Sequence, residues 1–167
     1  LNAIAIARAM GFDNIIGIDI DNSKLDAAHE MGASKTLNSK SENVVAELQK
    51  YAESRLMAVI DTFGGESTGQ LAVRALAKSG QYLLVGQAGG DFKMPQVWLP
   101  QKAMMVRGSH VGNSPQLRKL IDMVRAGKIK QMPIDRRQLS EINQAVDDLE
   151  QGRVTGRIVF QPDQGKL

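Results

Sequence analysis

The run Asn14–Asp19 is an apolar segment that ends in a carboxylate and leads into a helix-forming stretch. This pattern is typical of half of a dinucleotide-binding unit. In such a unit an acid at the end of a strand accepts hydrogen bonds from the two hydroxyls of an adenosine ribose. Asp19 is therefore the first candidate for a ligand contact. The alternative is that Asp19 only caps the helix that follows it.

A glycine-rich phosphate loop is expected about 20 residues before such an acid, at or before Leu1. Residues 1–11 instead have the character of the crossover helix that follows this loop, because they are nearly all apolar and end in Gly11. No capping Ser, Thr or Asp, initiator Met or signal peptide precedes them. We therefore expect a fragment, although a buried helix at a natural terminus is the alternative.

The composition narrows the classes of function. The chain has 167 residues, 43% of them hydrophobic, and no apolar run long enough to span a bilayer. It has no cysteine, so it carries no disulfide, thiolate nucleophile or cysteine metal site. The net charge is +3, and the basic stretch 125–137 lacks interleaved aromatics. We expect a piece of a soluble cytoplasmic enzyme with neither a membrane nor a nucleic acid as partner.

Strand and helix signals alternate along most of the chain. This alternation predicts an α/β fold with a doubly wound, mostly parallel sheet of the Rossmann type, lacking its first strand and glycine-rich loop. The segment 56–61 is a continuous apolar run, as expected of a strand that is buried on both faces. The segment 92–99 contains Pro95, which confines it to an edge strand or a connection. Further strands are expected at 35–38, 81–86 and 104–111, and helices at 23–31, 42–53, 67–77, 114–126 and 140–151. The helix at 23–31 is expected to be capped by Asn22 or Ser23.

The regular alternation of strand and helix signals changes near residue 128. We predict a partial dinucleotide-binding domain over 1–127. Residues 128–167 are predicted to return into another domain, the catalytic one, whose bulk lies upstream.

Six short motifs together resemble one family. In this order and spacing, the chain is similar to the C-terminal half of a medium-chain dehydrogenase/reductase of the zinc-type alcohol dehydrogenase group. Each motif alone is weak, because glycine after a buried strand is common. The motifs are Ile16–Asp19, Lys24-Leu25 with Met31–Ala33, Val59–Gly65, Leu84–Gly86, Val106–Gly112 and Gly152–Arg157.

The resemblance implies roles on the adenosine side of a cofactor. Asp19 corresponds to the acid that binds the ribose hydroxyls, and its charge would repel a 2′-phosphate, so NAD is expected rather than NADP. No arginine for a phosphate follows it. Lys24 would also reach the ribose, with plain surface charge as the alternative. Thr62 and Phe63 would line the adenine side, unless Phe63 simply packs in the core.

The resemblance also implies roles at the other end of the cofactor. Val85 and Gly86 would lie beside the nicotinamide, and Ser109 and Val111 would present backbone groups to its carboxamide. Alternation along the strand places His110 on the opposite face, where it would be a structural or interface residue. Arg157 would pair with the pyrophosphate through its guanidinium group.

For the whole protein, the resemblance implies hydride transfer between an alcohol or aldehyde substrate and NAD. The catalytic zinc would be held outside this chain, which offers two separated histidines as its only Cys or His residues. A homo-oligomer, a dimer or tetramer, would form through residues 92–111. Alone, the fragment is expected to be inactive and not natively folded.

Other interpretations remain open at this stage. A zinc-independent quinone or enoyl reductase of the same superfamily would keep the cofactor half. A Rossmann methyltransferase also ends its second strand in an acid. An inert, non-enzymatic remnant is the third alternative.

Overall fold

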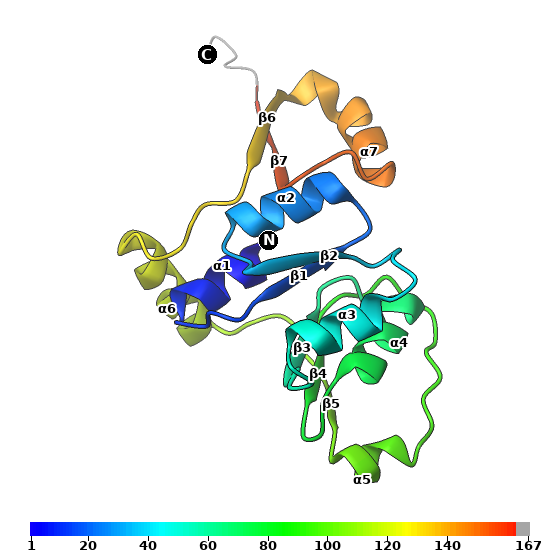
Figure 1. Ribbon diagram of the computed structural model, residues 1–167. Helices are drawn as coiled ribbons and strands as arrows, with labels where there is room; N and C mark the ends of the chain where they lie inside the picture. The colour runs from blue at the N-terminus through cyan, green and yellow to red at the C-terminus, as the bar shows by residue number, and fades with distance from the viewer. Residues whose placement is uncertain (163–167) are drawn as a thin grey trace. The chain divides into compact units, whose positions relative to one another are not determined.

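The computed structural model describes residues 1–162 (Figure 1). It divides into two compact units. Unit 1 contains residues 1–38 and the described residues from 121 onward, and unit 2 contains residues 39–120. The predicted return segment, 128–167, includes five residues outside the described ones, and its boundary at residue 128 stays a prediction.

Unit 1 begins with two parallel strands and two helices. β1 pairs in parallel with β2, with Ile16 opposite Lys35 and Asp19 opposite Asn38. Apolar residues such as Leu25 and Leu37 are buried between the helical and strand layers because the 3.6-residue and two-residue periods place them on facing sides. The elements are α1 (Asn2–Ala9), β1 (Ile16–Asp19), α2 (Asn22–Glu30) and β2 (Lys35–Asn38).

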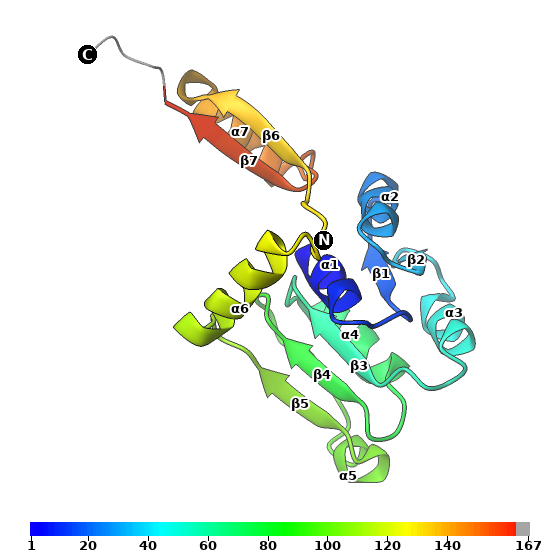
Figure 2. The same ribbon diagram turned by 90° about the vertical axis from the view of Figure 1, so that its left-hand side faces the viewer.

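The rest of unit 1 is a strand–helix–strand motif. β6 pairs in parallel with β7, with Ile134 opposite Arg157, and α7 lies along one face of this pair (Figure 2). The motif follows α6, whose first residues belong to unit 2. Asn113 and Gln116 cap α6 reciprocally, each side chain accepting from the other's backbone N–H at 3.0 Å. The elements are α6 (Ser114–Arg125), β6 (Ile134–Gln138), the 3₁₀ turn Leu139–Glu141, α7 (Ile142–Glu150) and β7 (Arg157–Gln161).

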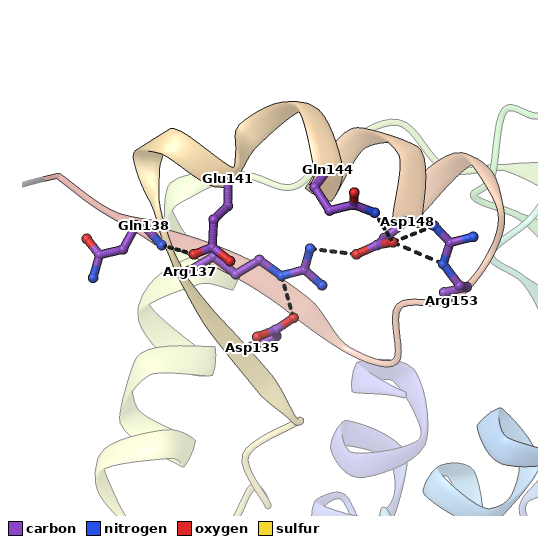
Figure 3. A network of polar contacts seen from close by, with 7 residues as sticks. All are labelled: Asp135, Arg137, Gln138, Glu141, Gln144, Asp148 and Arg153. Atoms are coloured by element: carbon purple, nitrogen blue, oxygen red, sulfur yellow. Dashed lines mark hydrogen bonds and ion pairs between the residues drawn. The ribbon is translucent and has the colours of Figure 1, made fainter.

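A carboxylate on α7 joins the parts of this motif (Figure 3). Asp148 accepts from Arg137 Nη1 of β6 at 2.6 Å and from Arg153 Nη2 of the following loop at 2.6 Å. Gln144, one turn earlier, donates to it at 3.0 Å. These bonds from Arg153, Arg137 and Gln144, in that order of effect, lower the pKa of Asp148 from 3.8 to about 2.

Acid should therefore weaken the motif within a defined range of pH. Because the folded pKa lies below the unfolded one, the contribution of Asp148 is complete above about pH 4 and is lost as the pH falls toward about 2. Thermal unfolding of the complete gene product should show the advantage of the wild type over Asp148→Asn shrinking across this interval. Asp147→Asn is the control, because the neighbouring Asp147 makes none of these contacts. Identical pH dependence of the two variants would contradict the prediction.

Unit 2 is a three-stranded parallel sheet in the order β3-β4-β5. Figure 2 shows the three strands running side by side. Ala58 lies opposite Gln81, and Gln81 lies opposite Met105. Its elements are α3 (Val44–Tyr51), β3 (Ala58–Asp61), α4 (Glu66–Ala75), β4 (Gln81–Leu84), α5 (Trp98–Lys102) and β5 (Met105–Gly108).

The core of unit 2 forms between α4 and the sheet. Val73 and Tyr82 are almost fully buried, and the Tyr82 ring meets Phe92 edge-on at 5.8 Å between centroids. Lys102 Nζ lies 5.2 Å from the centre of the Trp98 ring and donates to the carbonyls of Val73 and Leu76 near the end of α4. A cation at this end satisfies carbonyl groups that the helix leaves unpaired.

The α/β fold with parallel strands and flanking helices is confirmed, but three local expectations are wrong. The cap of α2 is Asp21, whose carboxylate accepts from Ser23 N at 2.8 Å, rather than Asn22 or Ser23. β3 is not buried on both faces, because α4 packs against it while Ile60 is 50% exposed. Residues 92–97 are a connection, which is one of the two forms expected, but Trp98 and Leu99 instead begin a helix, Trp98–Lys102, that accommodates Pro100 in its first turn.

The hydrogen-bonded ladders leave β1 and β3 in separate sheets. Within the described residues, β1 pairs with β2 alone and β3 pairs with β4 alone. No helix among residues 1–162 is long and apolar enough to cross a membrane.

Candidate functional site

Asp19 lies at the end of β1, as predicted, and it does not cap α2. Its Oδ1 accepts from the backbone N–H of Asp21 at 3.1 Å, while Asp21 itself caps the helix. The Oδ2 atom accepts no hydrogen bond from residues 1–162. The capping alternative is therefore wrong, and one carboxylate oxygen at the end of the strand is available to a ligand.

The amino end of α1 lies near two charged residues of unit 1, Asp19 and Arg157. Both Asp19 and Arg157 act electrostatically at Leu1, the residue before α1. Arg157 begins β7, where its backbone N–H donates to the Pro133 carbonyl at 3.1 Å and its side chain is exposed. An anion at this position would meet both a guanidinium group and the positive end of a helix.

Lys24 lies on α2, five residues after Asp19, and is partly buried. Its ammonium group is directed toward the loop after α7: a Cβ built on Gly152 would lie 3.6 Å from Lys24 Nζ. Lys24 is therefore partly covered rather than fully exposed, and its contact with a ribose stays a prediction.

In unit 2, the turns after β3 and β4 pack directly against each other. The backbone N–H groups of Val85 and Gly86 both donate to the Asp61 carbonyl at 2.9 Å. Ala88 N donates to Phe63 O at 3.0 Å, and Gly89 N donates to Gly64 O at 3.1 Å. Gly86 thus fills a position where two turns meet backbone to backbone.

This approach leaves no room for a side chain. A Cβ at Gly86 would lie 2.2 Å from the carbonyl carbon of Phe63, and one at Gly64 would lie 2.1 Å from the Gly86 oxygen. Gly64 also has a φ of +73°, a conformation that L side chains rarely adopt. The resemblance assigns Gly86 a cofactor contact, and the structure adds that the residue is needed for the turn itself.

Phe63 lies on the outside of this turn. Its side chain is 61% exposed and covers Gly65, so the alternative of core packing is wrong. The ring borders an open depression of about 470 Å³, which is lined by Phe63, Gly65, Glu66, Ser67, Gln70, Ala88 and Gly89. An exposed aromatic ring beside bare backbone is a surface on which a planar group can stack.

Asp61 and Tyr82 are site residues that sequence reasoning missed. The carboxylate of Asp61 accepts from the backbone N–H groups of Phe63 and Gly64 and from the Tyr82 hydroxyl, at 3.0, 2.8 and 2.9 Å. Burial by itself would raise the pKa of Asp61, but these bonds and the nearby Thr68 hydroxyl lower it overall. Burial and the same carboxylate raise the pKa of Tyr82. The available signal was an acid directly before a glycine-rich turn, where backbone N–H groups need acceptors.

The remaining predicted residues lie at the ends of β4 and β5. Val85 is 41% exposed, and Ser109 extends the ladder by donating from its backbone N–H to Leu84 O at 2.8 Å. β5 ends at Gly108, and Val111 has a φ of +46°, so strand alternation does not extend to His110 and Val111. Strand alternation therefore does not place His110 on the face opposite Ser109 and Val111, and its structural or interface role stays a prediction.

The parallel strands, with acids ending β1 and β3, define a Rossmann-type cofactor-binding half. The family described as "Zinc-binding dehydrogenase" matches residues 1–126. The chain belongs to this family. Its predicted place among medium-chain dehydrogenases of the zinc type is thereby confirmed.

The chain is similar to known alcohol dehydrogenases along nearly its whole length. An NAD-dependent alcohol dehydrogenase from Sulfurisphaera tokodaii is 34% identical over 161 residues, covering 96% of this chain and 46% of that protein. The crystal structure of the alcohol dehydrogenase from Aeropyrum pernix matches with a TM-score of 0.88 and 26% identity, over 96% of this chain and 46% of that one. The chain thus spans about half the length of the curated relatives it matches.

A quinone oxidoreductase shares the fold as well. The structure from Pseudomonas syringae matches with a TM-score of 0.81 and 24% identity, over 96% of this chain and 52% of that one. At this identity the likeness shows the fold alone. Among residues 1–162, no group of three or more His, Cys, Asp or Glu side chains could hold a metal ion.

Proposed function

We propose that this chain is the cofactor-binding half of an NAD-dependent alcohol dehydrogenase. The observation that carries the proposal is the carboxylate of Asp19, which ends β1, caps no helix and keeps Oδ2 open to a ligand. The curated relatives, two of them NAD-dependent alcohol dehydrogenases at 34% identity, support the same activity.

We propose that unit 1 binds the adenosine ribose and the pyrophosphate of NAD. Asp19 would accept hydrogen bonds from the ribose hydroxyls, with Lys24 nearby on the next helix. Arg157 and the amino end of α1 would hold the pyrophosphate, because they lie near each other and both attract anions. A 2′-phosphate would be repelled by the Asp19 charge, which favours NAD over NADP.

We propose that unit 2 contacts the adenine and nicotinamide rings of NAD. Phe63 would line the adenine side, and Val85 and Gly86 would lie beside the nicotinamide at the end of β4. Ser109 and Val111 would offer backbone groups to the carboxamide. When bound, NAD supplies the acceptor for a hydride from the alcohol carbon.

We propose that the catalytic zinc is held by residues outside this chain. The family description supports a zinc-binding parent, and the sequence here has no cysteine and two histidines, His29 and His110, on separate units. Among residues 1–162 no group of side chains could hold a metal ion, and the role that we propose for this chain is to bind and orient NAD. The cysteine-free sequence also suits the cytoplasm, where we propose that the protein acts.

The test is an assay of the product of the complete gene, whose sequence upstream of the Leu1 codon identifies any zinc ligands. We expect oxidation of alcohols with NAD, loss of activity with a chelator, and no activity from residues 1–167 alone. Quinone or enoyl reduction without metal would instead establish the zinc-independent reductase. A stop codon just upstream and no NAD binding would establish the inert remnant.

We also propose that the region 92–111 forms an interface between copies of this protein. β5 is the outer strand of its sheet, all four of its residues are exposed, and Met105 is 51% exposed. An outer strand presents unpaired backbone groups that a second copy can satisfy. Light scattering on the complete gene product should give the mass of a dimer or tetramer, with Val106→Pro lowering it. A wild-type monomer would contradict the proposal.

A further inference from the structure

Asp61 is the one charged side chain that is buried among residues 1–162, with 6% of its surface exposed. A carboxylate is retained in such a place only where hydrogen-bond donors compensate for the loss of water. Here the donors come from two sources. Phe63 N and Gly64 N bind Oδ1, and the Tyr82 hydroxyl binds Oδ2.

Tyr82 gives this carboxylate a fixed position. Its side chain is 1% exposed and packs with Val73, Leu76 and Phe92 in the core of unit 2. The phenol is therefore held by packing, and the hydroxyl holds the carboxylate. The turn itself is held by the other oxygen, Oδ1, which the Tyr82 hydroxyl does not contact.

The turn is held from its other side by the segment after β4. The Phe63 carbonyl accepts from Ala88 N, so both backbone polar groups of Phe63 are bonded, its N–H to Asp61 and its carbonyl to residue 88. The backbone of Phe63 is consequently fixed while its ring is 61% exposed. A ring that is exposed on a rigid backbone contributes more to binding than a mobile one, because less freedom is lost when a ligand arrives.

We propose that Asp61 is a positioning residue for cofactor binding: it fixes the Thr62–Gly65 turn so that the Phe63 ring is presented to the ligand. The contact between Phe63 and NAD rests on the proposed function, whereas the control of the turn by Asp61 does not. Asp61 itself touches no ligand in this account.

The test is a double-mutant cycle in the complete gene product with NAD as the titrated ligand. Asp61→Ala should weaken NAD binding by about tenfold, because it removes the acceptor that the N–H groups of Phe63 and Gly64 share. In the Phe63→Ala background the same change should have no further effect, since Asp61 acts through that ring. Tyr82→Phe is the matched control: it removes a bond to Asp61 but leaves both turn N–H bonds, so it should lower Tm with little change in NAD affinity.

Amide hydrogen exchange provides a readout that does not depend on NAD. Exchange at Phe63 and Gly64, the two amides that Asp61 accepts from, should be faster in Asp61→Ala and unchanged in Tyr82→Phe. The proposal is overturned if Asp61→Ala leaves this exchange unchanged, or if it weakens NAD binding equally with and without the Phe63 ring. Absence of NAD binding by the wild type would refute the proposed function, and exchange alone would then decide the role of Asp61 in the turn.

Discussion

Replacing Asp19 with asparagine should weaken NAD binding by about 10- to 100-fold and abolish the preference for NAD over NADP. Hydrogen bonds to a charged carboxylate contribute about 1.5–3 kcal/mol each, and asparagine retains a single neutral acceptor oxygen. Removing the negative charge also removes the repulsion of a 2′-phosphate. Calorimetric titration of the complete gene product with NAD and with NADP gives both affinities.

The neighbouring acid provides the control for this experiment. Asp21 caps α2 through Ser23 and has no proposed contact with the cofactor. Asp21→Ala should lower the free energy of unfolding by about 0.5–2 kcal/mol and leave the ratio of the two affinities unchanged. If Asp19→Asn also leaves that ratio unchanged, the assignment of Asp19 to the ribose is wrong.

Replacing Gly86 with alanine should disrupt the contact between the turns after β3 and β4. The new Cβ would lie 2.2 Å from the Phe63 carbonyl carbon and 2.5 Å from that of Thr62, both backbone atoms that cannot rotate away. The turns after β3 and β4 would have to separate, at a loss of about 1–3 kcal/mol in the free energy of unfolding. NAD affinity should fall as well, because Phe63 moves with its turn.

Gly108 is the matched position for this substitution. It ends the adjacent strand β5, and a Cβ built there has no atom within 4 Å. Gly108→Ala should therefore change the free energy of unfolding by less than about 1 kcal/mol, with either sign. Denaturant unfolding of the two variants compares them directly, and equal losses would show that the close contact at Gly86 is not what makes alanine costly.

Much of the fold follows from local patterns in the sequence. The segment 35–38 was predicted as a strand, and β2 has the same bounds. The alternation of apolar strands with helices predicts parallel pairing, which the sheets show. The site at the end of β1 was predicted because an acid after an apolar strand is a short-range signal. Asp19 and Arg157 came together only through the family resemblance, since no local pattern links residues so distant in the chain.

The features that the sequence did not predict depend on adjacent residues that could play the same role, or on contacts between residues distant in the chain. Asp19, Asp21, Asn22 and Ser23 can all cap a helix, so only the folded turn selects Asp21. Pro95 and Pro100 allow an extended strand or a helix start, and burial of Trp98 and Leu99 against the core favours the helix. The Asp61–Tyr82 bond spans 21 residues and depends on the register of two strands.

The aromatic residues of this chain are unevenly distributed between the two units. Its one tryptophan, Trp98, and its two tyrosines, Tyr51 and Tyr82, all belong to unit 2, whereas unit 1 contains phenylalanine alone. Tryptophan fluorescence and near-ultraviolet circular dichroism from this chain therefore report on unit 2, while far-ultraviolet circular dichroism reports on both. Loss of structure in unit 2 can therefore be followed by a tryptophan signal that unit 1 does not contribute to.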